Sequence, residues 1–234
     1  MLNTLLRVAV EWKVIARMPC RIQLLRVPRT QADFFDFDEY SRLIEASRAV
    51  GAEAHLVVLL GGDAGLRCGG MMALEWTDVD FSRRQLRVQR SEWKGKVTAP
   101  KSGQPRGVPM TARLAEALRA HKRMRGPRVV CQKDGKPLTQ KIVRNLARRS
   151  AERAVLAKQG VHILRHTFCS HLAMRGAPAR AIPELAGHQD LSTTQRYMHL
   201  SPAAIESAVR LLEEPAPVSR FGEMLETSGG GIRK

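Results

Sequence analysis

The chain has few cysteines and no long apolar run. Its 234 residues include Cys20, Cys68, Cys131 and Cys169, which lie far apart and form no Cys-x-x-Cys pair. That spacing argues against a disulfide framework and against a structural zinc site, and it suits a reducing cytoplasm. No apolar run reaches the roughly 18 residues that a helix needs to span a bilayer. We therefore expect a cytoplasmic protein without a membrane partner.

Acidic residues are also scarce relative to basic ones. Lys and Arg together number 39 against 22 Asp and Glu, which gives a net charge of +17. A surplus of this size favours a polyanionic partner, because each phosphate that is neutralised releases a condensed counterion. Hydrophobic residues make up 44% of the chain and charged residues 26%, as is usual for a globular protein with a buried core.

The spacing of apolar residues predicts a mainly helical fold with one small antiparallel sheet (α+β). An amphipathic helix is expected from the start of the chain to near Met18, because Pro19 follows. Asp36 and Glu39 have the spacing of a capping box, and Gly51 is expected to end the helix that they begin. A period of two predicts strands in "VDFSRRQLRVQRSEW" and "RGVPM". Further helices are expected in "AEAHLVVLLGGDAG", "TARLAEALRAHKRM", "LTQKIVRNLARRSAERAV", "HILRHTFCSH", "ARAIPELAG", "LSTTQRYM" and "SPAAIESAVRLLEE".

The segment "HILRHTFCSH" places three histidines and an arginine within ten positions. His162 and His166 have the i, i+4 spacing of a zinc-binding helix. However, Ile163 stands where a metalloprotease has a glutamate, and no third ligand is evident. On a helix, Leu164 belongs to the buried stripe, and Arg165 borders that stripe on the same side as His162. These residues predict a cation and an imidazole at the edge of a cleft.

The chain contains no cluster of carboxylates that would hold the ions of a metal-dependent nuclease. Asp78 and Asp80 stand alone, and a turn leading into a strand explains them better. Metal-independent chemistry on phosphate requires cations, proton-transfer groups and a nucleophile. The chain has two tyrosines. Tyr40 lies in an acidic amphipathic helix and is expected to be structural. Tyr197, in "TTQRYMHL", would by itself be best explained as a packed helical residue, because a phenol is a weak nucleophile until cations or a base activate it.

Four segments change the interpretation of Tyr197 as a packed helical residue. In order along the chain they are "GLRCGGMMALEWTDVD", "KSGQPRGVPM", "HILRHTFCSHL" and "LAGHQDLSTTQRYMHL". Their order and spacing resemble the tyrosine recombinase (phage integrase) family over about residues 36 to 212. The resemblance implies the catalytic-domain fold of that family and a site-specific recombinase or integrase activity. The catalytic residues that it implies are Arg67, Lys101, His162, Arg165, His188 and Tyr197.

The implied roles agree with the chemistry of these side chains. Arg67 and Arg165 can each hold nonbridging phosphate oxygens in a bidentate manner. Lys101 can protonate the departing 5′ oxygen, and His162 can accept the phenol proton. His188 can donate a hydrogen bond to the phosphate, and Tyr197 forms a 3′-phosphotyrosyl bond. Bond energy is conserved, so the resemblance implies no cofactor, neither ATP nor metal.

The resemblance also implies partners and domains. The partner is double-stranded DNA, bound by a homo-oligomer (a tetramer on paired sites) that can be a monomer without DNA. Residues 1–30 are expected to be the last helix of a core-binding domain with its linker, residues 31–213 the catalytic domain, and residues 214–234 a tail. In that tail Phe221, Met224 and Leu225 predict a short helix that docks in a groove of its own domain or of a neighbouring subunit.

One position departs from the family pattern. The family usually carries an acidic residue three positions after the first arginine, where this chain has Gly70. We expect the fold to be unaffected by this change and the reaction rate to be lower. Two alternatives therefore stay open: a catalytically impaired DNA-binding or regulatory protein, and a type IB topoisomerase-like enzyme that nicks and rejoins DNA.

Overall fold

The computed structural model describes residues 2–20, 33–100, 103–121 and 126–188. The chain divides into two compact units, Met1–Gln31 and Ala32–Lys234. The first unit holds helix α1 (Leu2–Glu11), in which no residue is buried. The expectation that this helix continues to Met18 is wrong. Lys13 has a left-handed backbone with φ 59°, a conformation that ends a helix well before Pro19 can act on it.

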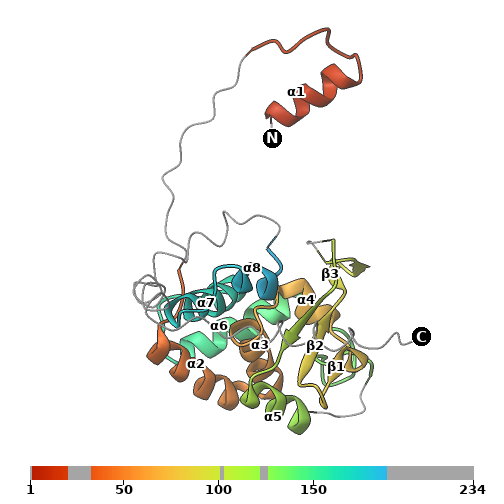
Figure 1. The fold of residues 1–234 in the computed structure, drawn as a ribbon. Helices are drawn as coiled ribbons and strands as arrows, with labels where there is room; N and C mark the ends of the chain where they lie inside the picture. Colours follow the sequence, from red (N-terminus) through yellow and green to blue (C-terminus); the bar gives the residue numbers. More distant parts are fainter. Residues whose placement is uncertain (1, 21–32, 101–102, 122–125, 189–234) are drawn as a thin grey trace, which may run out of the picture. The chain divides into compact units, whose positions relative to one another are not determined.

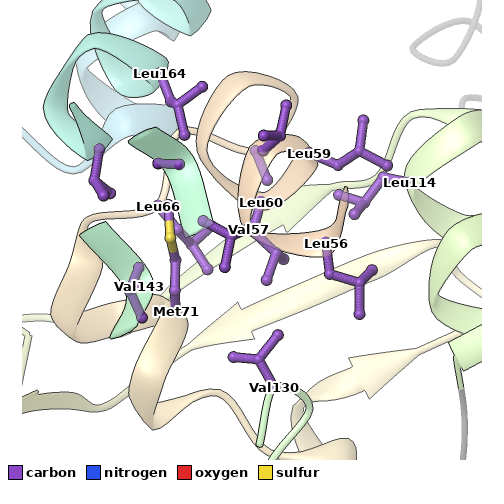
Figure 2. Packing of buried hydrophobic residues seen from close by; sticks show 14 of the residues in the cluster. Leu56, Val57, Leu59, Leu60, Leu66, Met71, Leu114, Val130, Val143 and Leu164 are labelled. Carbon is purple, nitrogen blue, oxygen red and sulfur yellow. The ribbon is translucent and has the colours of Figure 1, made fainter. Parts of the chain in front are cut away.

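The core of the second unit surrounds helix α3 (Ala52–Gly62). This helix is apolar on every side, and its residues from Leu56 to Gly62 are all buried, as is typical of a central helix. The longer helices that pack against it are α2 (Phe37–Val50), α5 (Ala112–His121), α6 (Gln140–Arg153) and α7 (Val161–Met174). Figure 1 shows α2, α6 and α7 at one side of α3 and the strands at the other. In Figure 2, Leu59 and Leu60 of α3 lie among side chains of these helices, including Leu164 and Leu114.

Three strands form an antiparallel sheet in the order β1 (Val79–Asp80), β2 (Gln85–Val88) and β5 (Arg106–Pro109). Leu86 stands opposite Val108, and both are buried, so the period of two places one face of the sheet on the core. Strands β3 (Ser91–Trp93) and β4 (Lys96–Thr98) form a separate hairpin. The α+β fold class is thus confirmed, but there are two small sheets rather than one.

The additional hairpin has a simple local cause. Lys94 and Gly95, between β3 and β4, both have positive φ, at 48° and 79°. A two-residue loop with both φ values positive is the turn that best matches the twist of paired strands. The strands predicted from the sequence leave the residues after Trp93 as a connection, because lysine and glycine are typical of loops.

The helix boundaries in the second unit follow local signals. Asp36 accepts a hydrogen bond from the backbone of Glu39, and the Glu39 side chain accepts one from the backbone of Asp36, so the predicted capping box is present. Gly51 ends α2, as predicted. Thr139 caps α6 in the same way as Asp36 caps α2. None of the helices in the described part of the chain is long and apolar enough to cross a membrane.

Two short helices carry the candidate site. Helix α4 (Cys68–Ala73) follows α3, and helix α8 (Ala181–Ala186) follows α7. The helices expected in "LSTTQRYM" and "SPAAIESAVRLLEE" lie outside the described residues, as does the tail with Phe221, Met224 and Leu225.

Candidate active site

Arg67 stands at the N-cap position of α4, with an extended backbone (φ −76°, ψ 157°). The turn that leads to it contains Gly65, whose φ of 62° favours glycine. The half-buried guanidinium of Arg67 donates through Nη2 to the carbonyl oxygen of Gly187 at 3.1 Å. Burial lowers the pKa of Arg67, which nevertheless remains charged at neutral pH. Arg67 thus joins the start of α4 to the end of α8.

Arg165 lies on α7 and is only 5% exposed. Its Nη1 donates to the carbonyl oxygen of Gly65 at 2.5 Å, so it is held against the turn that precedes Arg67. Cys169, one helical turn later, is buried, and this burial raises its thiol pKa to about 11 although the charges of Arg165 and Arg67 oppose the rise. The two arginines therefore converge on the same region. Arg165 is more deeply buried than a residue at the border of the apolar stripe was expected to be.

His188 owes its position to the way α8 ends. Gly187 adopts the left-handed conformation (φ 66°, ψ 54°) and donates its N–H to Glu184 O at 3.2 Å. The N–H of His188 then donates to Pro183 O at 2.9 Å. This pair of bonds is a Schellman motif, and it directs the chain away from the helix at a defined angle. His188 is thereby fixed next to Gly187, the residue that Arg67 contacts.

The electrostatic surroundings of His188 favour its neutral form. Its pKa is lowered to about 4, chiefly by burial and then by the charges of Arg165, Arg67, His166 and Arg106, in that order. At neutral pH the ring is therefore uncharged and has one N–H to donate. The effects of the arginines on His188 also show that α4, α7, α8 and β5 meet at one place.

His162 lies in the first turn of α7 and is exposed. It lines a cleft of about 790 Å³ together with Arg67, so the two residues face the same space. Other walls of this cleft come from the β3–β4 hairpin and from α6; their residues include Trp93, Gln140, Arg144 and Arg148. The predicted pair at a cleft edge was Arg165 with His162. In the structure the arginine that lines this cleft with His162 is Arg67, and Arg165 is not among the lining residues.

The remaining histidine of the segment "HILRHTFCSH" is structural. His171 Nε2 lies 2.9 Å from the carbonyl oxygen of Phe35, and its ring centroid lies 4.2 Å from that of Phe37. Burial lowers the pKa of His171, which favours the neutral ring. The three histidines of this segment therefore have different environments: the open cleft for His162, the neighbourhood of His188 for His166, and the packing beside α2 for His171.

The acidic residues considered as metal ligands have other partners. Asp78 accepts hydrogen bonds from Gln89 and Arg90. Asp80 accepts hydrogen bonds from Ser82 and Arg83, in the turn between β1 and β2. The explanation of Asp80 by a turn is confirmed. Within residues 2–20, 33–100, 103–121 and 126–188, no group of three His, Cys, Asp or Glu could hold a metal ion.

The structure thus brings together Arg67, Arg165 and His188, and it places His162 in the cleft beside Arg67. Lys101 and Tyr197 lie outside the described residues. One neighbouring residue was missed in the sequence analysis. Arg106, the first residue of β5, donates through Nε to Leu185 O at 2.9 Å and so reaches the same end of α8. Its only signal in the sequence is a basic residue in the segment "KSGQPRGVPM" after Lys101.

Comparison with known proteins identifies the family of the chain. The family model described as the phage integrase family matches residues 33–204. The chain belongs to this family. Among curated relatives, this integrase-family chain is 28% identical to the tyrosine recombinase XerC of Thermodesulfovibrio yellowstonii, over 88% of the chain and 69% of the relative. It is 32% identical to XerC of Xanthomonas campestris pv. campestris, over 75% of the chain and 53% of the relative.

A further relative is a XerC-like tyrosine recombinase of Caldanaerobacter subterraneus subsp. tengcongensis, 26% identical over 91% of the chain and 64% of the relative. The chain thus spans about half to two thirds of the length of these relatives. Among solved structures, the XerA recombinase is similar with a TM-score of 0.63 and 25% identity, over 82% of this chain and 70% of that one. The Tn1549 transposon integrase in complex with circular intermediate DNA has the same fold, with a TM-score of 0.72 and 20% identity, over 90% of this chain and 77% of that one.

Gly70, the departure from the family pattern, is the third residue of α4. It is buried, yet a Cβ at this position would meet only Val88 Cγ1, at 3.8 Å. Its neighbour Gly69 differs, because a Cβ there would lie 2.5 Å from Ser91 Oγ and 2.7 Å from Glu92 O. In this member of the phage integrase family, Gly69 is therefore required by packing, whereas Gly70 is not.

Proposed function

We propose that the chain is the catalytic part of a site-specific DNA recombinase or integrase, which cleaves and rejoins strands through Tyr197. The observation that carries the proposal is the convergence of Arg67, Arg165 and His188 beside a cleft that also contains His162. Two guanidinium groups and two imidazoles at one place are suited to a phosphodiester. Family membership supports the same reaction class.

In this proposal Arg67 and Arg165 hold the nonbridging oxygens of the scissile phosphate and stabilise the charge that grows on them. Both side chains are ordered by carbonyl contacts before DNA arrives, which lowers the cost of placing them. The neutral ring of His188 donates a hydrogen bond to the same phosphate. No metal ion is required for these roles.

The covalent step exchanges one phosphate ester for another. The phenol oxygen of Tyr197 attacks phosphorus, and His162 accepts the phenol proton. The bond from phosphorus to the 5′ oxygen breaks, and Lys101 protonates that oxygen as it leaves. The 3′-phosphotyrosyl bond stores the energy of the broken bond, so a second 5′ hydroxyl can reverse the step without ATP.

The walls of the cleft suit a nucleic acid. Arg144 and Arg148 extend along one face of α6 at i, i+4 spacing, and Trp93, which is 56% exposed, lies on the hairpin that forms another wall. These groups and the net charge of +17 support double-stranded DNA as the partner. We expect binding to weaken steeply with salt, with a log–log slope near −0.9 for each phosphate contacted.

The proposal includes the domain limits and the assembly. Residues 31–213 form the catalytic domain, residues 1–30 the end of a core-binding domain with its linker, and residues 214–234 a tail. The protein acts in the cytoplasm, on nucleoid DNA, as a homo-oligomer that assembles as a tetramer on paired sites. A catalytically impaired DNA-binding protein is the second candidate, because Gly70 replaces the usual acidic residue.

A suicide substrate tests the proposal. A duplex nicked near the cleavage site releases a short strand after attack and traps the covalent protein–DNA adduct. We expect the parent to form this adduct equally well with and without EDTA, and we expect Tyr197→Phe to bind DNA without forming it. Adduct in the Tyr197→Phe variant would place the nucleophile elsewhere. Specific DNA binding without adduct in the parent would favour the impaired protein instead.

A further inference from the structure

Arg106 and α8 are far apart in sequence and in direct contact in the structure. Arg106 Nε donates to Leu185 O at 2.9 Å, and the side chain is partly buried. Burial and the nearby charge of Arg67 lower the Arg106 pKa to about 10, so the side chain still carries its charge at neutral pH. A buried cation of this kind is stable only when its donors find acceptors. Here the last turn of α8 supplies one acceptor, Leu185 O.

The same guanidinium also fills the space beside Gly187. A Cβ at Gly187 would lie 2.7 Å from Arg106 Nη1 and 3.0 Å from Arg106 Cζ. Gly187 therefore meets two requirements at once, since its φ of 66° favours glycine and its missing side chain leaves room for Arg106. No other residue type would allow both the Schellman motif and this contact.

Two arginines thus hold the end of α8 from different elements. Arg67, at the start of α4, donates to Gly187 O, and Arg106, at the start of β5, donates to Leu185 O. The last carbonyls of a helix lack partners within the helix and carry partial negative charge, so cations bind there favourably. His188 follows directly and has little freedom to move relative to either arginine.

We propose that Arg106 is a positioning residue of the reaction, which clamps the end of α8 and thereby fixes His188 against the phosphate site formed with Arg67. The inference rests on the proposed function, because it assigns Arg106 to the same reaction. It also connects two parts of the site, since β5 begins shortly after Lys101 and α8 leads into the segment with Tyr197. The Arg106 side chain therefore joins the start of β5 to the turn that carries His188.

Direct contact with DNA phosphate is the competing role for Arg106. The observed contacts favour positioning, because Nε is engaged by Leu185 O and Nη1 lies against Gly187. The two roles also differ in what lysine can do. Lysine keeps the charge but cannot bond Leu185 O and fill the space beside Gly187 with the same planar group.

The experiment compares Arg106→Lys and Arg106→Gln with the matched control Arg87→Gln. Arg87 is exposed on β2, and its partner in the sheet is Gly107, so the control removes the same charge from the adjacent position. Single-turnover adduct formation on the suicide substrate and binding of the intact duplex are measured for the full chain. We expect both Arg106 variants to slow adduct formation by at least about tenfold, as small misplacement of a catalytic group does. Duplex binding and its salt dependence should stay those of the parent.

A second readout does not depend on activity. The C2 proton of His188, assigned in NMR spectra by comparison with His188→Gln, reports the His188 pKa in the free protein. The groups that face His188 are Arg67 on α4, Arg106 on β5, and Arg165 and His166 on α7. Removal of Arg106 should shift the His188 titration to higher pH, because one nearby cation is lost, and Arg87→Gln should leave it unchanged.

Three results would overturn the inference. The first is a parental cleavage rate and a parental His188 titration in both Arg106 variants. The second is a parental rate in Arg106→Lys alone, which would mean that charge without the guanidinium contacts is sufficient. The third is a salt slope reduced by about one in Arg106→Gln, which would mark Arg106 as a direct phosphate contact. If the parent forms no adduct at all, the proposed function fails, and the His188 titration still decides whether Arg106 holds the α8 end.

Discussion

The hydroxyl group of Tyr40 donates a 2.7 Å hydrogen bond to Oδ1 of Asp63, and both side chains are buried. Thr111 and Arg113 donate to the same carboxylate, so Asp63 is fully occupied inside the protein. Burial raises the pKa of Tyr40 well above its ordinary value, and the charge of Asp63 raises it further. Tyr40 therefore keeps its proton and is structural, as predicted. Tyr197 is left as the proposed nucleophile.

Tyr40→Phe should lower the free energy of unfolding by about 1 kcal/mol, since it removes one donor from a buried carboxylate. Urea denaturation of the variant and the parent measures this change. The variant should still form the covalent DNA adduct at the parental rate, in contrast to Tyr197→Phe. A folded Tyr40→Phe protein that forms no adduct would show that Tyr40 takes part in the reaction.

The adjacent glycines of α4 should respond in opposite ways to alanine. Gly69→Ala should destabilise the protein by about 1–3 kcal/mol, because its Cβ would overlap Ser91 Oγ and Glu92 O. Gly70→Ala should stabilise it by about 0.5–1 kcal/mol, because its Cβ would make only an ordinary contact with Val88 Cγ1 and alanine is the better helix former. Thermal unfolding followed by circular dichroism measures both. Equal effects at the two positions would contradict the packing difference.

Gly70→Glu should raise both stability and cleavage rate. Gly70 is the third residue of α4, and Arg67 is its N-cap residue, so a glutamate there can accept a hydrogen bond from the backbone N–H of Arg67. Such a bond would hold the backbone from which the Arg67 side chain extends. Gly70→Ala is the matched control, since it adds helix propensity without the carboxylate. A single-turnover rate for Gly70→Glu no higher than that of Gly70→Ala would indicate that this chain compensates elsewhere.

Val155 is a strained residue whose replacement should stabilise the protein. It occupies the left-handed position of the Schellman motif that ends α6, with φ 55°, and it is 85% exposed. A β-branched residue is unfavourable there, whereas the corresponding residue after α8 is Gly187. Val155→Gly should raise the free energy of unfolding by about 1 kcal/mol, because little packing is lost and the strain is relieved. Val155→Ala keeps the strain and should show a smaller gain. A lower melting temperature for Val155→Gly than for the parent would contradict the inference that the backbone of Val155 is strained.

Acid should destabilise the protein through three partly buried histidines. The His188 pKa is about 4 in the folded protein, below its ordinary value of 6.5, and burial also lowers the pKa of His55 and His171. Between these pH values the unfolded chain binds more protons than the folded one, so stability that is present above the unfolded pKa is lost as the pH falls toward the folded pKa. The urea midpoint should therefore be lower near pH 5 than near pH 7. His188→Gln should reduce the difference in urea midpoint between pH 5 and pH 7. An equal difference in parent and variant would show that the lowered pKa of His188 does not contribute to it.

Features encoded by neighbouring residues could be predicted from the sequence. The capping box of Asp36 and Glu39 and the end of α2 at Gly51 depend on residues within one helix. The buried character of α3 follows from an uninterrupted run of apolar residues. The assignment of Arg67, His162, Arg165 and His188 to one site came from a family resemblance. Helix and strand periodicity relate only residues a few positions apart, and Arg67 is far from the other three in the sequence.

By itself, the sequence determined the element types, the excess of positive charge and the identity of the reactive side chains. Tertiary structure alone decided which of those side chains meet. Arg165 became a buried group bound to Gly65, His171 became a packing residue against Phe35, and Arg106 was drawn to the end of α8. The physical reason is that a buried polar group must find its partner wherever the fold provides one. For these residues that partner lies on another element, many positions away in the chain.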